Sequence, residues 1–184
     1  MASAFGHAYM AYAIGSGYDD RIRNGKFLFL GILCSILPDA DVIGFQFGIA
    51  YDSFWGHRGF THSILFALLL GIFVSFLFYK NRITTKEGLR CIFFFFFCTL
   101  SHSLLDAMTS GGLGVAFFSP FNNGRYFFPW QPIQVSPIGA AKFFGERGLR
   151  VIVSEALWIG IPCSIYIVVV KIYRRIKRTN SRQV

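Results

Sequence analysis

Long apolar stretches alternate with short charged clusters along the chain. Five of these stretches have the length of a helix, at residues 3–18, 27–37, 61–79, 91–105 and 151–170. The third holds 19 consecutive residues without Asp, Glu, Lys or Arg, and a helix needs about 20 apolar residues to cross a bilayer. The pattern predicts an all-α, polytopic helical membrane protein with about four to five membrane-embedded helices.

The segment between the fourth and fifth stretches, residues 107–150, has a different composition. It is rich in Gly, Pro and aromatic residues, with helix breakers such as Gly111-Gly112 and Pro132. We therefore expect a long irregular extracytoplasmic loop here. The chain as a whole predicts a single membrane-embedded helical domain over residues 1–175, followed by a basic cytoplasmic tail over residues 176–184.

The composition excludes an ordinary water-exposed surface. Hydrophobic residues make up 54% of the 184 residues and charged residues only 15%, whereas soluble domains carry about 25% charged residues. Mean hydropathy is +0.50 and the isoelectric point about 9.7. The net charge of +9 would suggest nucleic-acid binding in a soluble protein, but the excess of cytoplasmic Lys and Arg in membrane proteins explains it here. No nucleic-acid partner is therefore expected.

The basic residues also predict how the chain is oriented, if the five segments alternate across the membrane. No Lys or Arg precedes Arg21, so the first segment is expected to stay on the protein and not to be a cleaved signal peptide. One side collects 13 basic residues: Arg21, Arg23, Lys26, Lys80, Arg82, Lys86, Arg90, Lys171, Arg174, Arg175, Lys177, Arg178 and Arg182. The other side has five: Arg58, Arg125, Lys142, Arg147 and Arg150. The first side should be cytoplasmic.

All the histidines fall in short polar islands beside apolar helices. Ionisable groups inside a membrane are costly, at roughly 2.5 to 3.5 kcal/mol each, and tend to be kept for function. At about 1.5 Å per helical residue, the islands lie roughly 18 to 27 Å from the cytoplasmic basic clusters, so they share one depth in the outer half of the membrane. We expect them to converge; they contain His7, Asp39, Asp41, His57, His62, His102 and Asp106.

These residue types predict a divalent metal site. His102 and Asp106 are four positions apart, so both side chains leave one face of a helix. Mixed imidazole and carboxylate ligands fit Zn²⁺ or another first-row metal better than Ca²⁺, and a set with an open position is typical of a hydrolytic site. Taken alone, His7 is more often a packing residue, Asp39 and Asp41 are as often a helix-terminating turn, and Thr61 is expected to cap the third helix.

Three further residues are weaker candidates. Arg58 and Arg125 lie on the outer side, where a guanidinium group can bind a substrate phosphate through two hydrogen bonds, although Arg125 is more simply a solvated or headgroup-facing cation. Glu155 is either an additional metal ligand or a member of an interfacial ion pair with Arg147 or Arg150.

Taken in order, these islands resemble a bacterial family of membrane-bound metal-dependent hydrolases whose best-known member is a LexA-regulated inner-membrane protein. The matching residues are His7, Pro38-Asp39-Ala40-Asp41, His57-Arg58-Gly59-Phe60-Thr61-His62-Ser63, and His102-Ser103-Leu104-Leu105-Asp106 with Thr109 and Gly112. The resemblance covers residues 1 to 125 and implies a bacterial inner-membrane location.

More remotely, the pattern is similar to zinc-dependent phospholipase C and the P1-type nucleases. That similarity implies phosphoester hydrolysis by a metal-activated hydroxide at a cluster of two or three ions, Zn²⁺ first among the candidates, with catalytic roles for Asp39, Asp41, Arg58 and His62. No histidine follows His102, so a third ion would need Glu155 as a replacement ligand.

The sequence thus predicts a membrane-bound hydrolase acting on a lipid or lipid-linked phosphoester from the extracytoplasmic side. The alternative is a metal-binding structural or regulatory membrane protein without hydrolase activity. A metal transporter is disfavoured because the polar groups occupy only one half of the helices. The residues themselves do not exclude a small-molecule or peptide substrate, and they do not identify protein partners.

Overall fold

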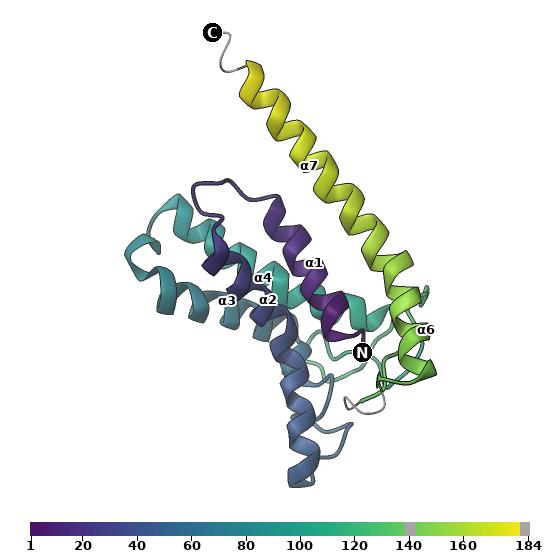
Figure 1. Cartoon of the computed structure of the whole chain (residues 1–184). Helices are drawn as coiled ribbons and strands as arrows, with labels where there is room; N and C mark the ends of the chain where they lie inside the picture. Colours follow the sequence, from purple (N-terminus) through teal and green to yellow (C-terminus); the bar gives the residue numbers. More distant parts are fainter. Residues whose placement is uncertain (139–142, 181–184) are drawn as a thin grey trace.

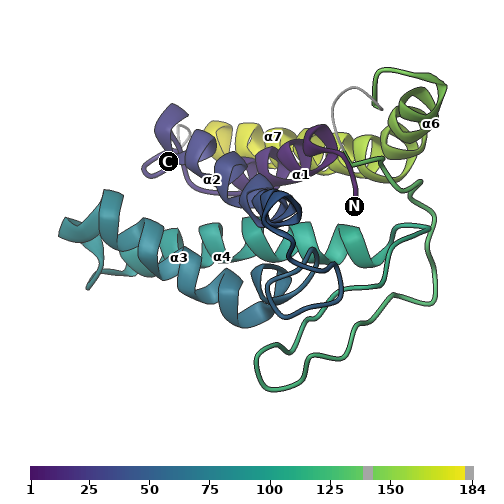
Figure 2. The ribbon, with the colours of Figure 1, turned by 90° about the horizontal axis from the view of Figure 1, so that it is seen from below.

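The computed structural model is all-helical and describes residues 1–138 and 143–180. Consecutive helices from α1 to α4 run in alternating directions, α7 lies beside α1 and runs the same way, and the polar islands lie toward one end of the bundle (Figures 1 and 2). The helical segments are α1 (Ala4–Ser16), α2 (Gly25–Ile36), the 3₁₀ segments η1 (Leu37–Phe47) and η2 (Phe60–His62), α3 (Ile64–Tyr79), the 3₁₀ turn η3 (Lys80–Arg82), α4 (Lys86–Ala107), α6 (Glu146–Glu155), the π-helical η4 (Ala156–Gly160) and α7 (Ile161–Asn180).

Four helical segments are long and apolar enough to cross a membrane, which confirms the polytopic helical class. They are Gly25–Phe47, Ile64–Arg82, Lys86–Ala107 and Glu146–Asn180. The last combines α6, η4 and α7, so it begins before residue 151, where the apolar pattern placed its start. With 13 residues, α1 is about 20 Å long, which is shorter than a hydrocarbon core of about 30 Å.

The core between α1, α2 and α4 is built on stacked aromatic rings. The rings of Phe27 and Phe94 stack with their centroids 3.8 Å apart, and Phe95 is fully buried beside them. A Cβ at Gly31 would lie 2.4 Å from the Phe94 ring, so the missing side chain allows α2 to approach α4 closely. In contrast, Phe73 and other large apolar side chains of α3 are exposed, as expected for a surface that faces lipid.

The second polar island lies where α2 changes direction. The 3₁₀ segment η1 begins at Leu37, directly after Ile36, the last residue of α2, and Pro38 is its second residue. Proline removes a backbone donor and disfavours continuation of an α-helix, and η1 leaves the bundle at a steep angle (Figure 1). The bend therefore places Asp39 and Asp41 beside the bundle and not along the continuing helix axis.

The long connection after α4 is irregular, as the sequence predicts, and it covers the polar end of the bundle. Isolated bridges pair Thr109 with Ile133 and Val115 with Tyr126. The α1–α2 connection, the α3–α4 connection and the end of α7 all lie at the opposite end (Figure 2), so the three basic clusters of the sequence gather there. Within the expected tail, α7 continues to Asn180, and the rest of that tail lies outside the described residues.

Candidate metal centre

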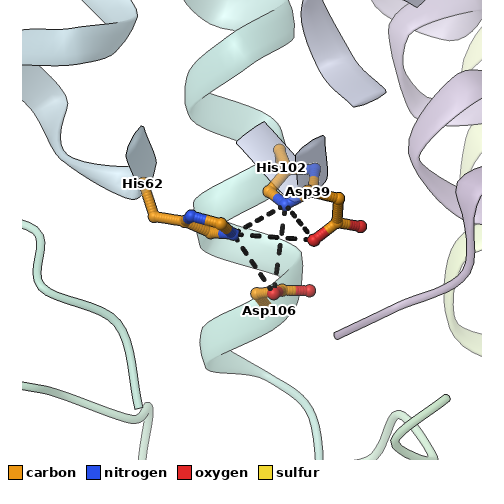
Figure 3. A group of neighbouring side chains, drawn as sticks. All are labelled: Asp39, His62, His102 and Asp106. Atoms are coloured by element: carbon orange, nitrogen blue, oxygen red, sulfur yellow. Dashed lines mark hydrogen bonds and ion pairs between the residues drawn. The ribbon is translucent and has the colours of Figure 1, made fainter. Parts of the chain in front are cut away.

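Four ligand-type side chains from three parts of the chain meet at the polar end of the bundle. Figure 3 shows Asp39 after the bend, His62 before α3, and His102 and Asp106 on one face of α4. The side chains of His62, His102 and Asp106 are fully buried, and that of Asp39 is 11% exposed. The predicted convergence of these four residues is therefore present in the structure.

The distances between the ligand atoms match the size of a first-row metal site. The Nε2 atoms of His62 and His102 are 3.0 Å apart, and Oδ1 of Asp39 lies 3.3 Å and 3.7 Å from His102 and His62 respectively. Oδ2 of Asp106 lies 3.7 Å and 3.9 Å from the same two nitrogens. Bonds of about 2.0 to 2.1 Å in a tetrahedron give edges of roughly 3.3 Å, so the set is close to this size before any ion is bound.

A second group, formed by Asp41, His57 and His62, lies beside the first and shares His62 with it. The two carboxylate oxygens of Asp41 already have four neighbours. Oδ1 lies 2.7 Å from Nδ1 of His57, and Oδ2 accepts hydrogen bonds from the Arg58 backbone N–H and from Thr61 Oγ1. Nδ1 of His62 is 3.3 Å from the same Oδ2. A carboxylate behind the outer nitrogen of a ligating histidine fixes the orientation of its ring.

His62 and His57 lie outside the four candidate membrane spans and titrate differently. Burial opposes protonation of both, but the contacts of His62 with Asp39 and Asp41 outweigh burial and raise its pKa from 6.5 to about 9. For His57, burial outweighs the hydrogen bond to Asp41 and lowers the pKa. The contacts with Asp39 and Asp41 thus favour a positive charge on His62.

His7 reaches the same region from α1 but belongs to neither group of three or more ligands. Its ring stacks on that of His102, with centroids 3.8 Å apart, and its Nε2 lies 3.5 Å from Oδ1 of Asp106. Both ring nitrogens are buried without a hydrogen-bond partner among the described residues, as is Oδ1 of Asp39. Such atoms are costly to bury, and a metal ion is one way of satisfying them.

Arg58 does not fit the predicted role of a substrate contact, because its guanidinium group is fully buried and already bonded to protein. Nε donates to Oδ2 of Asp106 at 3.0 Å, Nη1 to the Gly111 carbonyl, and Nη2 to Thr109 Oγ1. Its backbone has a φ of 64°, which is uncommon outside glycine. A Cβ at Gly112 would lie 2.7 Å from Nη1, so glycine there leaves room for the guanidinium group.

Arg125 also contacts backbone and not an open substrate space. Its guanidinium group donates to the carbonyl oxygens of Tyr51, Ser53 and His57. This arrangement differs both from the predicted phosphate contact and from a freely solvated cation. Arg125 instead ties the long loop after α4 to the segment that carries His57.

Glu155 lies next to the site but is engaged by the N-terminal segment. Its carboxylate accepts hydrogen bonds from the backbone N–H and the hydroxyl of Ser3. The neighbouring residue Ala2 donates its N–H to Oδ1 of Asp106 at 2.7 Å. Neither Arg147 nor Arg150 forms an ion pair with Glu155 in the described part of the chain, so the interfacial ion pair is not formed. Glu155 also lies outside both ligand groups.

The sequence does not predict two of the residues that orient the candidate ligands. Thr61 was expected to cap α3, but the cap is Ser63, whose side chain accepts the Phe66 N–H, while Thr61 Oγ1 donates to Asp41 at 2.7 Å. The backbone carbonyl of Ser35 lies 2.7 Å from Nδ1 of His102, which leaves Nε2 to face the other ligands. The position of Thr61 directly before His62 could have indicated its role from the sequence. The contact of the Ser35 carbonyl could not, because every residue has a backbone carbonyl.

The fold and the site together define a polytopic helical membrane protein with a buried cluster of histidines and aspartates able to hold a metal ion. Residues 1–177 match the family described as YdjM inner membrane protein, and the chain belongs to that family. It is 40% identical over 163 residues to the inner membrane protein YbcI of Escherichia coli (strain K12), covering 88% of this chain and 92% of that protein. No solved structure matches it. The family supports a multi-pass location in the inner membrane.

Proposed function

We propose that this protein is a membrane-embedded, metal-dependent hydrolase of phosphoester bonds in a lipid or lipid-linked substrate. The observation that carries the proposal is the group formed by Asp39, His62, His102 and Asp106, whose ligand atoms lie within 4.8 Å of one another. Two imidazoles with two carboxylates are a donor set for Zn²⁺ and other first-row metals, whereas Ca²⁺ prefers oxygen ligands alone.

The arrangement favours one ion in this four-residue group over the two or three ions expected from the sequence. A second ion between Asp41, His57 and His62 would need the Nδ1 of His62 while the first ion uses its Nε2, and a neutral imidazole offers only one free nitrogen. We therefore assign Asp41 to the orientation of His57 and His62. A second ion would more readily use His7 with Oδ1 of Asp106. A metal content above one ion per chain would indicate binding at this second position.

The chain's own residues would position both ion and substrate. A bound divalent ion supplies Lewis-acid chemistry, because it acidifies water and polarises a phosphoryl oxygen. Asp39 is the most accessible member of the group, at 11% exposure against 0% for the other three, so the substrate would approach on its side. Arg58 donates to Oδ2 of Asp106, the oxygen that faces the two histidines, and so holds that carboxylate in place, and burial of the remaining ligands limits the access of bulk water.

An apolar groove beside the site supports a lipid substrate. It encloses about 330 Å³ and is lined by Phe5, Gly6, Tyr9, Ile152, Glu155, Ala156, Ile159 and Gly160, from α1, α6 and η4. Glu155 connects the groove to the site through Ser3 and the adjacent Ala2, which contacts Asp106. A chain entering from the bilayer could therefore lie in this groove while its phosphate reaches the polar end of the bundle.

The test is turnover measured beside metal content. Detergent-solubilised protein loaded with Zn²⁺ should release phosphate or a phosphorylated headgroup from a panel of bacterial phospholipids and lipid diphosphates. EDTA should abolish the release. Asp39→Asn should lower turnover by at least about 100-fold, because a neutral amide is a poorer metal ligand, whereas Asp52→Asn, on the exposed loop, should not lower it.

The alternative is a metal-binding protein with a structural or regulatory role. Fully metal-loaded wild type that turns over no member of the panel would favour this alternative, provided that EDTA still lowers its thermal stability. Protein that binds no metal under any loading condition would contradict both functions.

A further inference from the structure

We propose that the cleft between α1 and α7, at the basic end of the bundle, binds an anionic phospholipid. The lipid phosphate would lie among arginine and lysine side chains, and an acyl chain would lie in the apolar continuation of the cleft. The two helices lie side by side, and α7 continues past the end of α1 (Figures 1 and 2). Beyond the end of α1, one side of the cleft is therefore formed by α7.

The outer part of the cleft carries a strong excess of positive charge. It encloses about 600 Å³ and contains five cationic side chains and one carboxylate. Its lining residues are Tyr12, Ser16, Asp20, Arg23, Lys171, Arg174, Arg175, Arg178 and Thr179. A net charge of this sign selects anions, and guanidinium groups match the oxygens of a phosphate through paired hydrogen bonds.

The cations are held in place around a single aspartate. Arg23 Nη2 lies 2.5 Å from Oδ1 of Asp20 and Arg174 Nη1 lies 3.4 Å from the same oxygen, while Arg178 contacts Oδ2. Arg174 also donates to the Tyr18 carbonyl. One carboxylate neutralises one of these three cations, so the arginines are oriented but not neutralised. Lys171 and Arg175 are exposed and form no ion pair within the described part of the chain, so they add two cations to the same wall.

The cleft becomes apolar along the helices, which a site for a free phosphate would not need. A neighbouring pocket shares Asp20, Arg174 and Arg178 with the basic part and extends to Gly17 and Tyr166. Gly17 and Tyr166 in turn belong to a mainly apolar pocket of about 430 Å³, whose other lining residues are Met10, Ala13, Ile14, Tyr18, Phe97, Pro162 and Cys163. Cations at one end and an apolar channel at the other match a phosphate headgroup and its chain.

The position of the cleft relative to the membrane supports the same occupant. At this end of the bundle, each of the four candidate spans has basic residues at or next to its terminus. Tyr12, Tyr166 and Tyr173 are partly exposed along the cleft. Tyrosine is enriched at membrane interfaces, and basic pockets between transmembrane helices on the cytoplasmic side bind anionic headgroups.

This site is distinct from the metal centre. His7 lies near the start of α1 and Ser16 at its end, which places them roughly 14 Å apart along the helix axis. Binding of the lipid therefore does not rest on the proposed hydrolase activity, and His102→Ala should leave it unchanged.

The experiment is a binding titration of the full chain in an uncharged detergent. The ligands are dioctanoyl phosphatidylglycerol, dioctanoyl phosphatidylcholine and glycerol 3-phosphate, with affinity measured by native mass spectrometry. We expect saturable binding of the phosphatidylglycerol and much weaker binding of the other two. Lys171→Gln with Arg175→Gln should weaken that binding by roughly 30-fold, since two cations are lost and no described ion pair is broken.

The matched control is Lys80→Gln with Arg90→Gln, which removes the same charge at the same end but outside the cleft and should retain the wild-type affinity. Equal weakening in both double variants would overturn the proposal, because binding would then be general charge attraction. Glycerol 3-phosphate or phosphatidylcholine binding as tightly as phosphatidylglycerol would also overturn it. If the cleft double variant is not monodisperse, Arg175→Gln alone should weaken binding by about fivefold, and an unchanged affinity would contradict the proposal.

Discussion

His102 and Asp106 stand one helical turn apart on α4, with Nε2 of His102 and Oδ2 of Asp106 separated by 3.9 Å. Each is fixed from outside the group, His102 by the Ser35 carbonyl and Asp106 by Arg58 and the Ala2 N–H. This spacing leaves both ligand atoms facing His62 and Asp39 across a buried space. The pair on α4 is therefore the rigid half of the candidate metal centre.

Loss of either residue of this pair should remove bound metal. His102→Ala and Asp106→Asn should each lower the metal content of purified, Zn²⁺-loaded protein by at least about tenfold, since each deletes one of four ligands. Elemental analysis after gel filtration measures the metal-to-protein ratio of each variant. Ser101→Ala is the control, because Ser101 is buried on the same helix and, within residues 1–138 and 143–180, its hydroxyl donates only to the Cys98 carbonyl. Full metal retention in the His102 and Asp106 variants would place the ion elsewhere.

The two arginines near the site should behave differently when they are neutralised. Arg58→Gln removes the buried partner of Asp106 and should lower the free energy of unfolding by about 3 kcal/mol, together with metal affinity. Arg125→Gln removes contacts to backbone carbonyls at a partly exposed position, so metal affinity should stay within about twofold of wild type. Thermal unfolding and competitive Zn²⁺ titration measure the two effects. Equal metal affinity in both variants would contradict a supporting role for Arg58.

The sequence predicted the helices well because lipid imposes a simple rule on composition. Residues 61–79 contain no Asp, Glu, Lys or Arg, and a helix is one of two ways in which such a backbone satisfies its hydrogen bonds in a bilayer. The convergence of the four candidate ligands was also predictable, because each is a costly ionisable group beside an apolar segment. His102 and Asp106 carried the clearest signal, since helical spacing alone places them on one face.

The roles of the surrounding residues could not be predicted in the same way. Whether Arg58 faces substrate or ligand depends on the path of the irregular loop that brings Thr109 and Gly111 to its guanidinium group. The sequence of that loop has no periodic pattern from which its path could be predicted. Likewise, the contact between Glu155 and Ser3 joins positions 152 residues apart, and local sequence contains no information on such a pairing.

Glu155 should not be required for metal binding. Glu155→Gln keeps an oxygen that can accept one hydrogen bond from Ser3, so we expect unchanged metal content and a loss of stability of about 1 kcal/mol. Glu146→Gln, in the first turn of the same helix, is the matched control for the lost charge. A drop in the metal-to-protein ratio in Glu155→Gln alone would make Glu155 a ligand and support an additional ion.

The distribution of basic residues predicts that the loop after α4 is extracytoplasmic and the end of α7 cytoplasmic. Asn123→Cys should react with a membrane-impermeant thiol reagent in intact spheroplasts, and Asn180→Cys should react only after lysis. The four native cysteines are free and buried, so unlabelled wild type provides the background. The reverse labelling pattern would turn the metal centre toward the cytoplasm.

The most direct test of the metal centre is X-ray absorption spectroscopy of the zinc-loaded protein, combined with its metal-to-protein ratio. The structure predicts about one tightly held ion per chain, with two imidazole ligands and oxygen ligands at about 2.0 to 2.1 Å. Any zinc that His62→Ala or His102→Ala still retains should show half the imidazole scattering per ion. A spectrum without imidazole scattering, or a metal content near zero after loading, would contradict the assignment of these residues as a metal site.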